Sequence, residues 1–209
     1  MKKLLAVSIF LAGLIAILSS QYEKKQETFA LSTLKIITNT GHGSGVHIGN
    51  GYILTAAHVV DGSASIRVRA THNGEEPAEL LWLNKAHDVA LLRSDHLKGV
   101  DSSPLSCKPL GVGQSVKATG NPGPLEFITS WGRVSSDEAK RGNWKSSIIV
   151  DLTIAPGSSG GPVFDTHGNV VGLVVGIALM SHGFSSSAIP YSYVVPGSAI
   201  CSLLARNSS

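Results

Sequence analysis

The chain contains few charged residues, few cysteines and only one long apolar run. Charged side chains make up 15% of its 209 residues. This is too few for a long helical repeat, which would be richer in Ala, Glu, Lys and Leu. Lys and Arg form no stripe along the sequence, so nucleic acid is not an expected partner. Glycine is abundant instead, with 23 residues, and this favours short strands joined by glycine-containing turns.

The histidines and cysteines show no spacing typical of a metal site. No H-E-x-x-H motif occurs, and His42 and His47 lack ligand-like partners. We therefore expect no metal and no other cofactor. The only cysteines are Cys107 and Cys201. They are compatible with one disulfide in an oxidising compartment or with two buried thiols, because the sequence does not show whether the two side chains lie within bonding distance.

The one long apolar run lies near the N-terminus. Lys2 and Lys3 precede apolar residues 4–18, an order typical of a secretory signal. The run is shorter than the roughly 20 residues that cross a bilayer. Leu18 stands where a small residue favours cleavage, so residues 1–20 are predicted to be a cleaved signal peptide or an uncleaved membrane anchor. In both cases the rest of the chain is exported, to the periplasm or the extracellular space.

The remaining chain divides into two clusters of short predicted strands. Residues 21–30 are polar and predict a flexible lead-in. Residues 101–112 contain Gly, Asp, Ser and Pro and predict a connector, which separates an N-terminal β lobe over 31–100 from a C-terminal β lobe over 113–209 that ends in a short helix. The predicted strands are 44–48, 52–55, 65–70, 78–83, 88–93, 115–119, 127–135, 147–152, 162–164, 170–176 and 187–194.

The strongest chemical signal is the segment GSSGGP at residues 157–162. A nucleophilic serine must project from a tight turn, and flanking glycines allow the backbone angles that such a turn requires. We predict Ser159 as the nucleophile. The loop formed by Gly157, Ser158 and Ser159 is the predicted oxyanion hole, with the amides of Gly157 and Ser159 as donors. The alternative interpretation is a plain Gly/Ser loop.

A serine hydroxyl needs an adjacent base, and the base needs an orienting carboxylate. His58 lies in TAAHVV, at the end of an apolar strand and before a turn, where a cleft can reach it. Asp88 opens the apolar segment DVALL. Taken singly, each residue also fits a structural role: His58 as a buried core histidine and Asp88 as a cap on exposed backbone.

In this order, TAAHVV, DVALL and GSSGGP resemble the trypsin-like serine protease family, and most closely its HtrA-type branch. The segments GSGV at 43–46, GNP at 120–122 and GNVVG at 168–172 also agree. The resemblance implies an all-β fold of two six-stranded antiparallel β-barrels (chymotrypsin-like) with a short C-terminal helix. His58 and Asp88 would come from the first barrel and Ser159 from the second.

The implied function is that of a serine endopeptidase acting on protein or peptide substrates through an acyl-enzyme. Ser158 stands where many trypsin-like enzymes carry Asp, which implies no activation through a new N-terminus. No PDZ-type domain is recognised after the protease part, unlike typical HtrA-type proteins. The family often ties the connector to the terminal helix by a disulfide, which favours a bridge between Cys107 and Cys201.

By the same resemblance, two stretches form the wall of the substrate pocket. Neither contains Asp, so cleavage after Arg or Lys is not favoured, and an apolar side chain is expected before the cleaved bond. His182 lining a pocket for an acidic residue is the alternative. The predicted wall residues are Thr153, Ile154, Ala155, Pro156, Val174, Val175, Gly176 and Ile177.

Two other functional classes share features with this sequence. The G-x-S-x-G elbow of an α/β-hydrolase requires the order Ser, acid, His and a helix-rich chain, and this chain has the opposite order and few helical patterns. A catalytically silent, protease-like binding module stays open, because the sequence does not show whether the oxyanion loop is folded.

Overall fold

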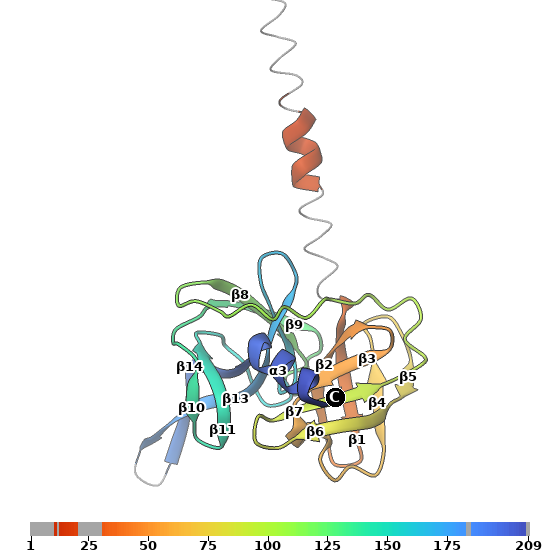
Figure 1. The fold of residues 1–209 in the computed structure, drawn as a ribbon, viewed down its shortest axis with the longest axis vertical. Coiled ribbons are helices and arrows are strands. Elements are labelled where there is room, and N and C mark those ends of the chain that lie inside the picture. Colours follow the sequence, from red (N-terminus) through yellow and green to blue (C-terminus); the bar gives the residue numbers. More distant parts are fainter. Residues whose placement is uncertain (1–10, 12, 21–30, 183–184, 208–209) are drawn as a thin grey trace, which may run out of the picture.

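In the computed structural model, which describes residues 11, 13–20, 31–182 and 185–207, the chain forms two β lobes with one helix packed across them (Figure 1). The predicted lead-in and most of the predicted signal segment lie outside the described residues. Over the part that is described, no helix combines the length and apolar character needed to span a bilayer.

The N-terminal lobe is an antiparallel sheet of seven strands in the order β5-β4-β1-β2-β3-β7-β6. β5 pairs with β4, β6 pairs with β7, and between them the Ala78 amide donates to the Ile66 carbonyl at 3.0 Å. β5 and β6 are thus two halves of one bent strand that closes the sheet into a barrel. The strands are β1 (Thr33–Thr38), β2 (His42–Gly49), β3 (Tyr52–Thr55), β4 (Ile66–Arg69), β5 (Glu75–Pro77), β6 (Glu79–Asn84) and β7 (Val89–Arg93).

The C-terminal lobe repeats this arrangement in the order β10-β11-β14-β13-β12-β8-β9. β9 pairs with β8, Val134 bridges to Val150, and β10 pairs with β11, so one bent segment again joins the two edges. The predicted pair of six-stranded barrels is confirmed once each bent strand is counted as one. The strands are β8 (Ser115–Gly120), β9 (Ile128–Arg133), β10 (Ala139–Arg141), β11 (Trp144–Val150), β12 (Pro162–Phe164), β13 (Val170–His182) and β14 (Ser185–Pro196).

The sequence analysis did not predict three of these strands. β5 and β10 have three residues each, too few for an alternation of apolar and polar residues to be recognised. In β1, Leu34 and Ile36 are buried on one face, but Ile37 adds an apolar residue on the other and breaks the period of two. The pattern alone therefore missed two strands of the N-terminal lobe and one strand of the C-terminal lobe.

A shared apolar core joins the lobes and fixes how they face one another. Side chains of β2, β3 and β7 pack against β12, β13 and β14 and against the helix α3 (Gly197–Asn207), which lies across both lobes (Figure 1). Burial of each large side chain contributes about 1.5–3 kcal/mol. The fully buried members include Val46, Leu54, Val89, Phe164, Leu173, Val195 and Ile200.

A disulfide attaches α3 to the segment between the lobes. Cys107 and Cys201 are bonded, with their Cα atoms 5.6 Å apart and a sequence separation of 94. At the start of α3, a Cβ on Gly197 would lie 2.3 Å from the Ser106 carbonyl oxygen, so only glycine allows the connector to pass this closely. The helix is therefore bonded to the connector at Cys201, and its first residue lies close against the connector backbone.

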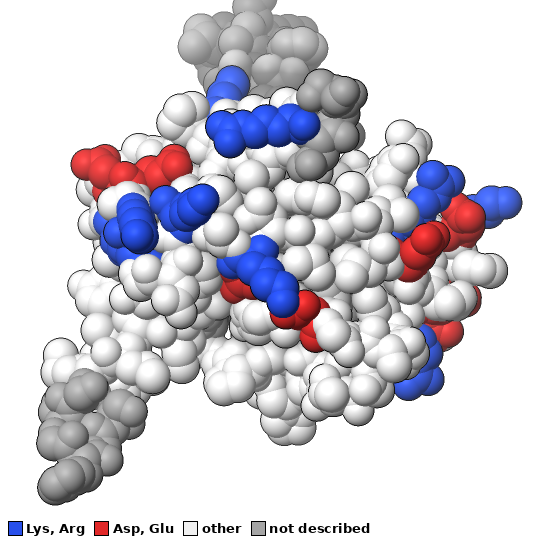
Figure 2. All heavy atoms as spheres, turned by 60° about the horizontal axis from the view of Figure 1, so that its bottom comes forward, with Lys and Arg blue, Asp and Glu red and all other residues white. Residues whose placement is uncertain are grey.

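Charges on the surface are mixed in sign. On the face in Figure 2, Lys and Arg side chains lie next to Asp and Glu side chains at several places. The ion pairs include Arg67–Glu75, Lys85–Asp61 and Arg93–Asp95. This face therefore offers no large field of one sign to attract a charged partner.

Candidate active site

His58 and Asp88 meet at one end of the N-terminal lobe. His58 lies in α2 (Ala57–Val60), which directly follows β3, and Asp88 directly precedes β7. Because β3 and β7 are antiparallel neighbours, the end of one lies beside the start of the other. His58 Nδ1 lies 2.7 Å from Asp88 Oδ2, and the His58 amide donates to Oδ1 at 2.9 Å.

The two side chains differ in exposure, and each shifts the pKa of the other. The Asp88 hydrogen bond raises the pKa of His58 above its usual value, against the opposing effect of burial. Burial alone would raise the pKa of Asp88, but the hydrogen bonds and charge of His58 outweigh it and hold that pKa below the usual range. The His58 side chain is 49% exposed and the Asp88 side chain only 9%, so the imidazole faces outward from a buried carboxylate.

The GSSGGP segment forms a tight turn at the edge of the C-terminal lobe. The Ser158 amide donates to the Ala155 carbonyl at 3.0 Å, and the Gly160 amide donates to the Val174 carbonyl at 2.7 Å. Gly157 and Gly160 have φ values of 98° and 81°, a region that L-residues rarely adopt. The glycines of the motif are therefore required by the turn itself.

The same turn packs against the segment that carries His58. The Ser44 amide donates to the Ser159 carbonyl at 2.8 Å. A Cβ on Gly43 would lie 3.1 Å from that carbonyl oxygen and 2.7 Å from Val59, the neighbour of His58. Ser159 is half-buried, and its hydroxyl makes no hydrogen bond to any other described residue. The predicted nucleophile thus lies beside α2 with an accessible hydroxyl.

Two backbone amides in the turn donate to no acceptor in the described part of the chain. The Pro156 carbonyl accepts from the Gly123 amide at 2.8 Å, and the Ser158 carbonyl accepts from the Gly161 amide at 2.9 Å. The N–H of a trans peptide points away from its C=O, so these bonds set the directions of the Gly157 and Ser159 amides. Among the described residues neither amide has an acceptor, and both are available to a bound group.

A buried pair of polar side chains supports this turn, and the sequence analysis did not single it out. The Ser44 hydroxyl donates to the Gly157 carbonyl at 2.8 Å and accepts from the Asn121 amide at 2.9 Å. Asn121 Nδ2 donates to the Leu34 carbonyl at 3.2 Å. Ser44 and Asn121 lie in the motifs GSGV and GNP, which could have indicated this pair but were interpreted only as parts of the family resemblance.

A third contact to Asp88 was also missed. Trp144, at the start of β11, donates its indole N–H to Asp88 Oδ2 at 3.3 Å. Trp144 belongs to the C-terminal lobe and lies 56 residues from Asp88 in the chain. No local pattern connects two such residues.

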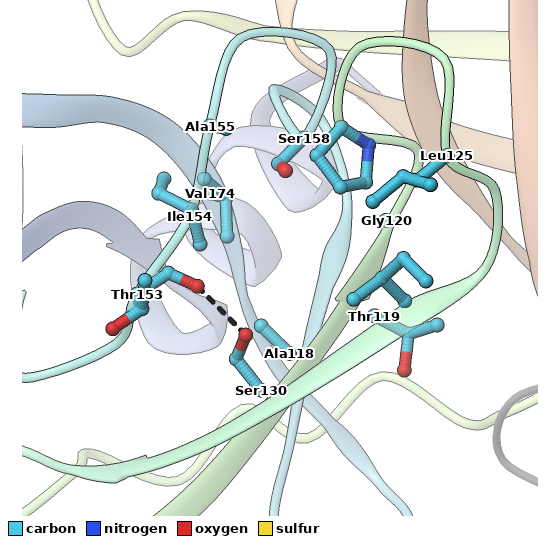
Figure 3. Close-up of a pocket in the computed structure, with 12 residues that line it drawn as sticks. Ala118, Thr119, Gly120, Leu125, Ser130, Thr153, Ile154, Ala155, Ser158 and Val174 are labelled. Carbon is cyan, nitrogen blue, oxygen red and sulfur yellow. Dashed lines mark hydrogen bonds between the residues drawn. The ribbon is translucent and has the colours of Figure 1, made fainter.

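A cavity of about 240 Å³ lies next to the turn (Figure 3). Four predicted wall residues line it, namely Thr153, Ile154, Ala155 and Val174. In Figure 3 the side chains of Ile154 and Val174 face Leu125 across the space. The opposite wall comes from residues 118–130, which were not among the predicted wall residues. Its lining residues are Ala118, Thr119, Gly120, Pro122, Leu125, Ile128 and Ser130.

The other predicted wall residues lie elsewhere. Ile177 lines a neighbouring cavity of about 210 Å³ together with Ile154 and Tyr191. Pro156, Val175 and Gly176 line neither cavity. Val175 is buried in the core between the lobes, and Gly176 packs against the Trp144 ring. The side chain of His182 lies outside the described residues.

Sequence comparisons agree with this arrangement. A probable periplasmic serine endoprotease, DegP-like, of Pseudomonas savastanoi pv. phaseolicola is 38% identical over 154 residues, which cover 71% of this chain and 32% of that protein. The chloroplastic protease Do-like 1 of Arabidopsis thaliana is 31% identical over 183 residues, covering 82% and 40%. The chain therefore spans about a third of the length of the curated relatives first matched.

Solved structures show the same fold at lower sequence identity. The HtrA-type protease AlgW, solved with a tripeptide, has a TM-score of 0.76 at 24% identity, covering 88% of this chain and 62% of that one. The active form of the protease Rv3671c from M. tuberculosis has a TM-score of 0.74 at 23% identity, covering 87% and 82%.

The paired imidazole and carboxylate and the glycine-bounded serine turn lie within one family match. Residues 43–173 match the trypsin-like peptidase domain. This range contains His58, Asp88 and Ser159. The chain belongs to the trypsin-like peptidase domain family.

Proposed function

We propose that the chain is a serine endopeptidase with His58, Asp88 and Ser159 as its catalytic triad. One observation carries the proposal: the 2.7 Å pair of His58 and Asp88 lies beside the Ser159 turn. The family match and the names of the relatives, which are serine endoproteases, support the same activity.

Each residue has a distinct chemical role in the proposed reaction. His58 Nε2 takes the proton of the Ser159 hydroxyl as that oxygen attacks the peptide carbonyl, and then delivers it to the leaving amine. Asp88 keeps the His58 proton on Nδ1 and stabilises the imidazolium. The hydrogen bond between the base and the nucleophile often shortens only when substrate binds. A Ser159 hydroxyl that makes no hydrogen bond to another described residue is therefore compatible with this role.

The amides of Gly157 and Ser159 supply the oxyanion site. Charge develops on the carbonyl oxygen during attack, and each preorganised donor to it contributes about 3 kcal/mol in such sites. Ser158 provides the backbone between them, and its own amide is used within the turn. The acyl-enzyme then forms on Ser159 and is hydrolysed by water through the same residues.

The proposed reaction depends on pH through His58. The residue must be neutral to accept a proton, and its pKa is raised above the usual 6.5 by Asp88. Activity therefore falls as the pH decreases through this raised pKa, and the acid limb of kcat/KM has its midpoint above pH 6.5.

The cavity beside the turn favours an apolar residue before the cleaved bond. Its wall contains Ile154, Val174 and Leu125, and none of the described residues that line it carries a charged side chain. A volume of about 240 Å³ accommodates an aliphatic side chain. We therefore propose protein or peptide substrates that are cleaved after aliphatic residues.

The proposed site of action is outside the cytoplasm. The disulfide between Cys107 and Cys201 is typical of an oxidising compartment, and several relatives are named periplasmic. Whether residues 1–20 are removed or anchor the chain is tested by the N-terminal sequence of the mature protein.

The test of the proposed function is labelling by a fluorophosphonate probe together with hydrolysis of casein. The wild type should react covalently at Ser159, and Ser159→Ala should lose labelling and at least about 10⁴-fold in turnover while it folds normally. Ser202→Ala, which removes an exposed hydroxyl on α3, should behave like the wild type. A folded wild type that neither labels nor cleaves would instead be a protease-like binding module.

A further inference from the structure

The Asp88 carboxylate is held from both lobes. Within the N-terminal lobe, Oδ1 accepts from the His58 amide and Oδ2 accepts from His58 Nδ1. From the C-terminal lobe, the Trp144 indole N–H donates to Oδ2 at 3.3 Å. A carboxylate that is almost fully removed from water needs such donors to remain charged.

The Trp144 ring has little freedom to leave this position. Its centroid lies 5.0 Å from the centroid of the Tyr193 ring on β14. A Cβ on Gly176, the cross-strand partner of Tyr193, would lie only 2.8 Å from Trp144 Cη2, so the absence of a side chain at Gly176 makes room for the indole. The next residue, Lys145, donates its amide to the Ala86 carbonyl at 2.8 Å, which fastens β11 to the turn before Asp88.

We infer that Trp144 is a positioning residue that acts through Asp88, and that it makes the geometry of the His58–Asp88 pair depend on how the two lobes are docked. An indole N–H only donates hydrogen bonds and does not titrate. It therefore fixes the position of Oδ2 without competing for the proton on His58 Nδ1. This inference rests on the proposed function of the site.

The decisive variant is Trp144→Phe, which keeps an aromatic ring in the slot and removes the N–H. We expect kcat to fall about tenfold, with KM changed less than twofold, because a donor to a charged group is lost and substrate contacts are not. Without the indole donor, the Asp88 carboxylate interacts more strongly with protonated His58 and raises the pKa of His58 further. The acid limb of kcat/KM should therefore move to higher pH. The substitution leaves the other titratable groups near this turn in place, namely His87, Lys145, Arg206, Glu138 and the Lys85–Asp61 pair.

The matched control is Trp131→Phe. Trp131 lies on β9 and is 72% exposed, so its substitution removes an indole N–H from a surface site and should leave both kcat and the acid limb unchanged. A merely structural role for Trp144 would lower the melting temperature without moving the acid limb. That result, or wild-type kinetics in Trp144→Phe, would overturn the inference.

A second measurement keeps the inference testable if Trp144→Phe does not fold. The chain has three tryptophans, and their indole ¹H–¹⁵N signals in the wild type can be assigned with Trp82→Phe and Trp131→Phe. We expect the Trp144 signal to titrate with the same midpoint as the acid limb. A signal that is independent of pH across this midpoint contradicts the inference, whereas a wild type that fails to label at Ser159 contradicts only the proposed function.

Discussion

The two lobes hold their reactive groups by different means. In the N-terminal lobe, His58 and Asp88 are fixed by directional bonds between side chains and one backbone amide. In the C-terminal lobe, the Ser159 turn is fixed mainly by backbone hydrogen bonds and by glycines with positive φ, with one side-chain hydrogen bond from Ser44. An imidazole must be held in one tautomer, whereas an oxyanion site requires aimed amides. The first lobe should therefore be sensitive to side-chain chemistry and the second to added volume.

The largest effect is expected from Asp88→Asn, which changes the chemistry of the first lobe alone. Asp88 has a φ of 59°, a conformation that asparagine tolerates well, so the backbone should be retained. The neutral amide no longer favours the reactive tautomer of His58, and kcat at pH 7 should fall about 10⁴-fold. Steady-state peptide hydrolysis measures this. Activity within tenfold of the wild type would remove Asp88 from the triad.

Gly157→Ala tests the second lobe by adding a single methyl group. A Cβ there would lie 2.4 Å from the Asn121 carbonyl oxygen and 2.7 Å from His42 Nε2, so the turn must move and its amides lose their aim. We expect kcat to fall about 10²- to 10³-fold.

The matched control for this substitution is Gly113→Ala. Gly113 also has a positive φ, of 85°, but a Cβ there meets nothing within 4 Å. It should cost about 1 kcal/mol of stability and leave kcat unchanged. Equal losses of kcat in both variants would mean that backbone strain, rather than displacement of the oxyanion amides, limits the reaction.

Loss of the disulfide should lower the stability of the whole chain and leave the geometry around His58, Asp88 and Ser159 unchanged. Replacing Cys107 and Cys201 together by serine removes a cross-link across 94 residues, which should lower the free energy of unfolding by about 3–5 kcal/mol. Urea denaturation measures this loss, with wild type treated with reductant as the comparison. Because neither cysteine contacts the triad, kcat of the folded protein should remain within twofold of the wild-type value.

The smallest effect is expected where the lobes are joined by charge. Glu126, on the segment that also presents the Gly123 amide to Pro156, pairs with Lys35 at 2.8 Å and with Arg69. Glu126→Gln should lower kcat/KM about two- to fivefold, because these partly exposed pairs are screened by solvent. Glu75→Gln, which breaks a surface pair with Arg67 within the N-terminal lobe, should leave activity unchanged.

The contribution of Glu126 to the free energy of unfolding should depend on pH. Lys35 and Arg69 lower the pKa of Glu126 from 4.5 to about 2. Its stabilising effect is therefore fully present above about pH 4.5 and is lost as the pH falls toward 2. The stability difference between wild type and Glu126→Gln, of about 1 kcal/mol or less, should disappear over this interval. A difference that persists at pH 2 would exclude the ion pairs as its origin.

Strand β4, in which buried and more exposed residues alternate, was predicted to within one residue at each end. β3 and β12 were predicted with their observed limits although both are short and mostly buried on both faces, whereas β1, β5 and β10 were missed. The cavity beside the Ser159 turn shows a similar limit. Thr153, Ile154, Ala155 and Val174 line it and belong to the stretches that the family resemblance indicated, but the facing wall comes from β8, β9 and the loop between them.

The sequence by itself predicted the side chains of the proposed triad and determined how the chain must turn around Ser159, because glycine spacing and residue type act over a few neighbouring positions. The tertiary structure decided which distant groups surround them. Ser44 reaches Gly157 across 113 residues and Trp144 reaches Asp88 across 56. Such contacts depend on how two barrels dock through a shared apolar core, and burial in that core is not directional, so no local pattern encodes the partners that docking brings together.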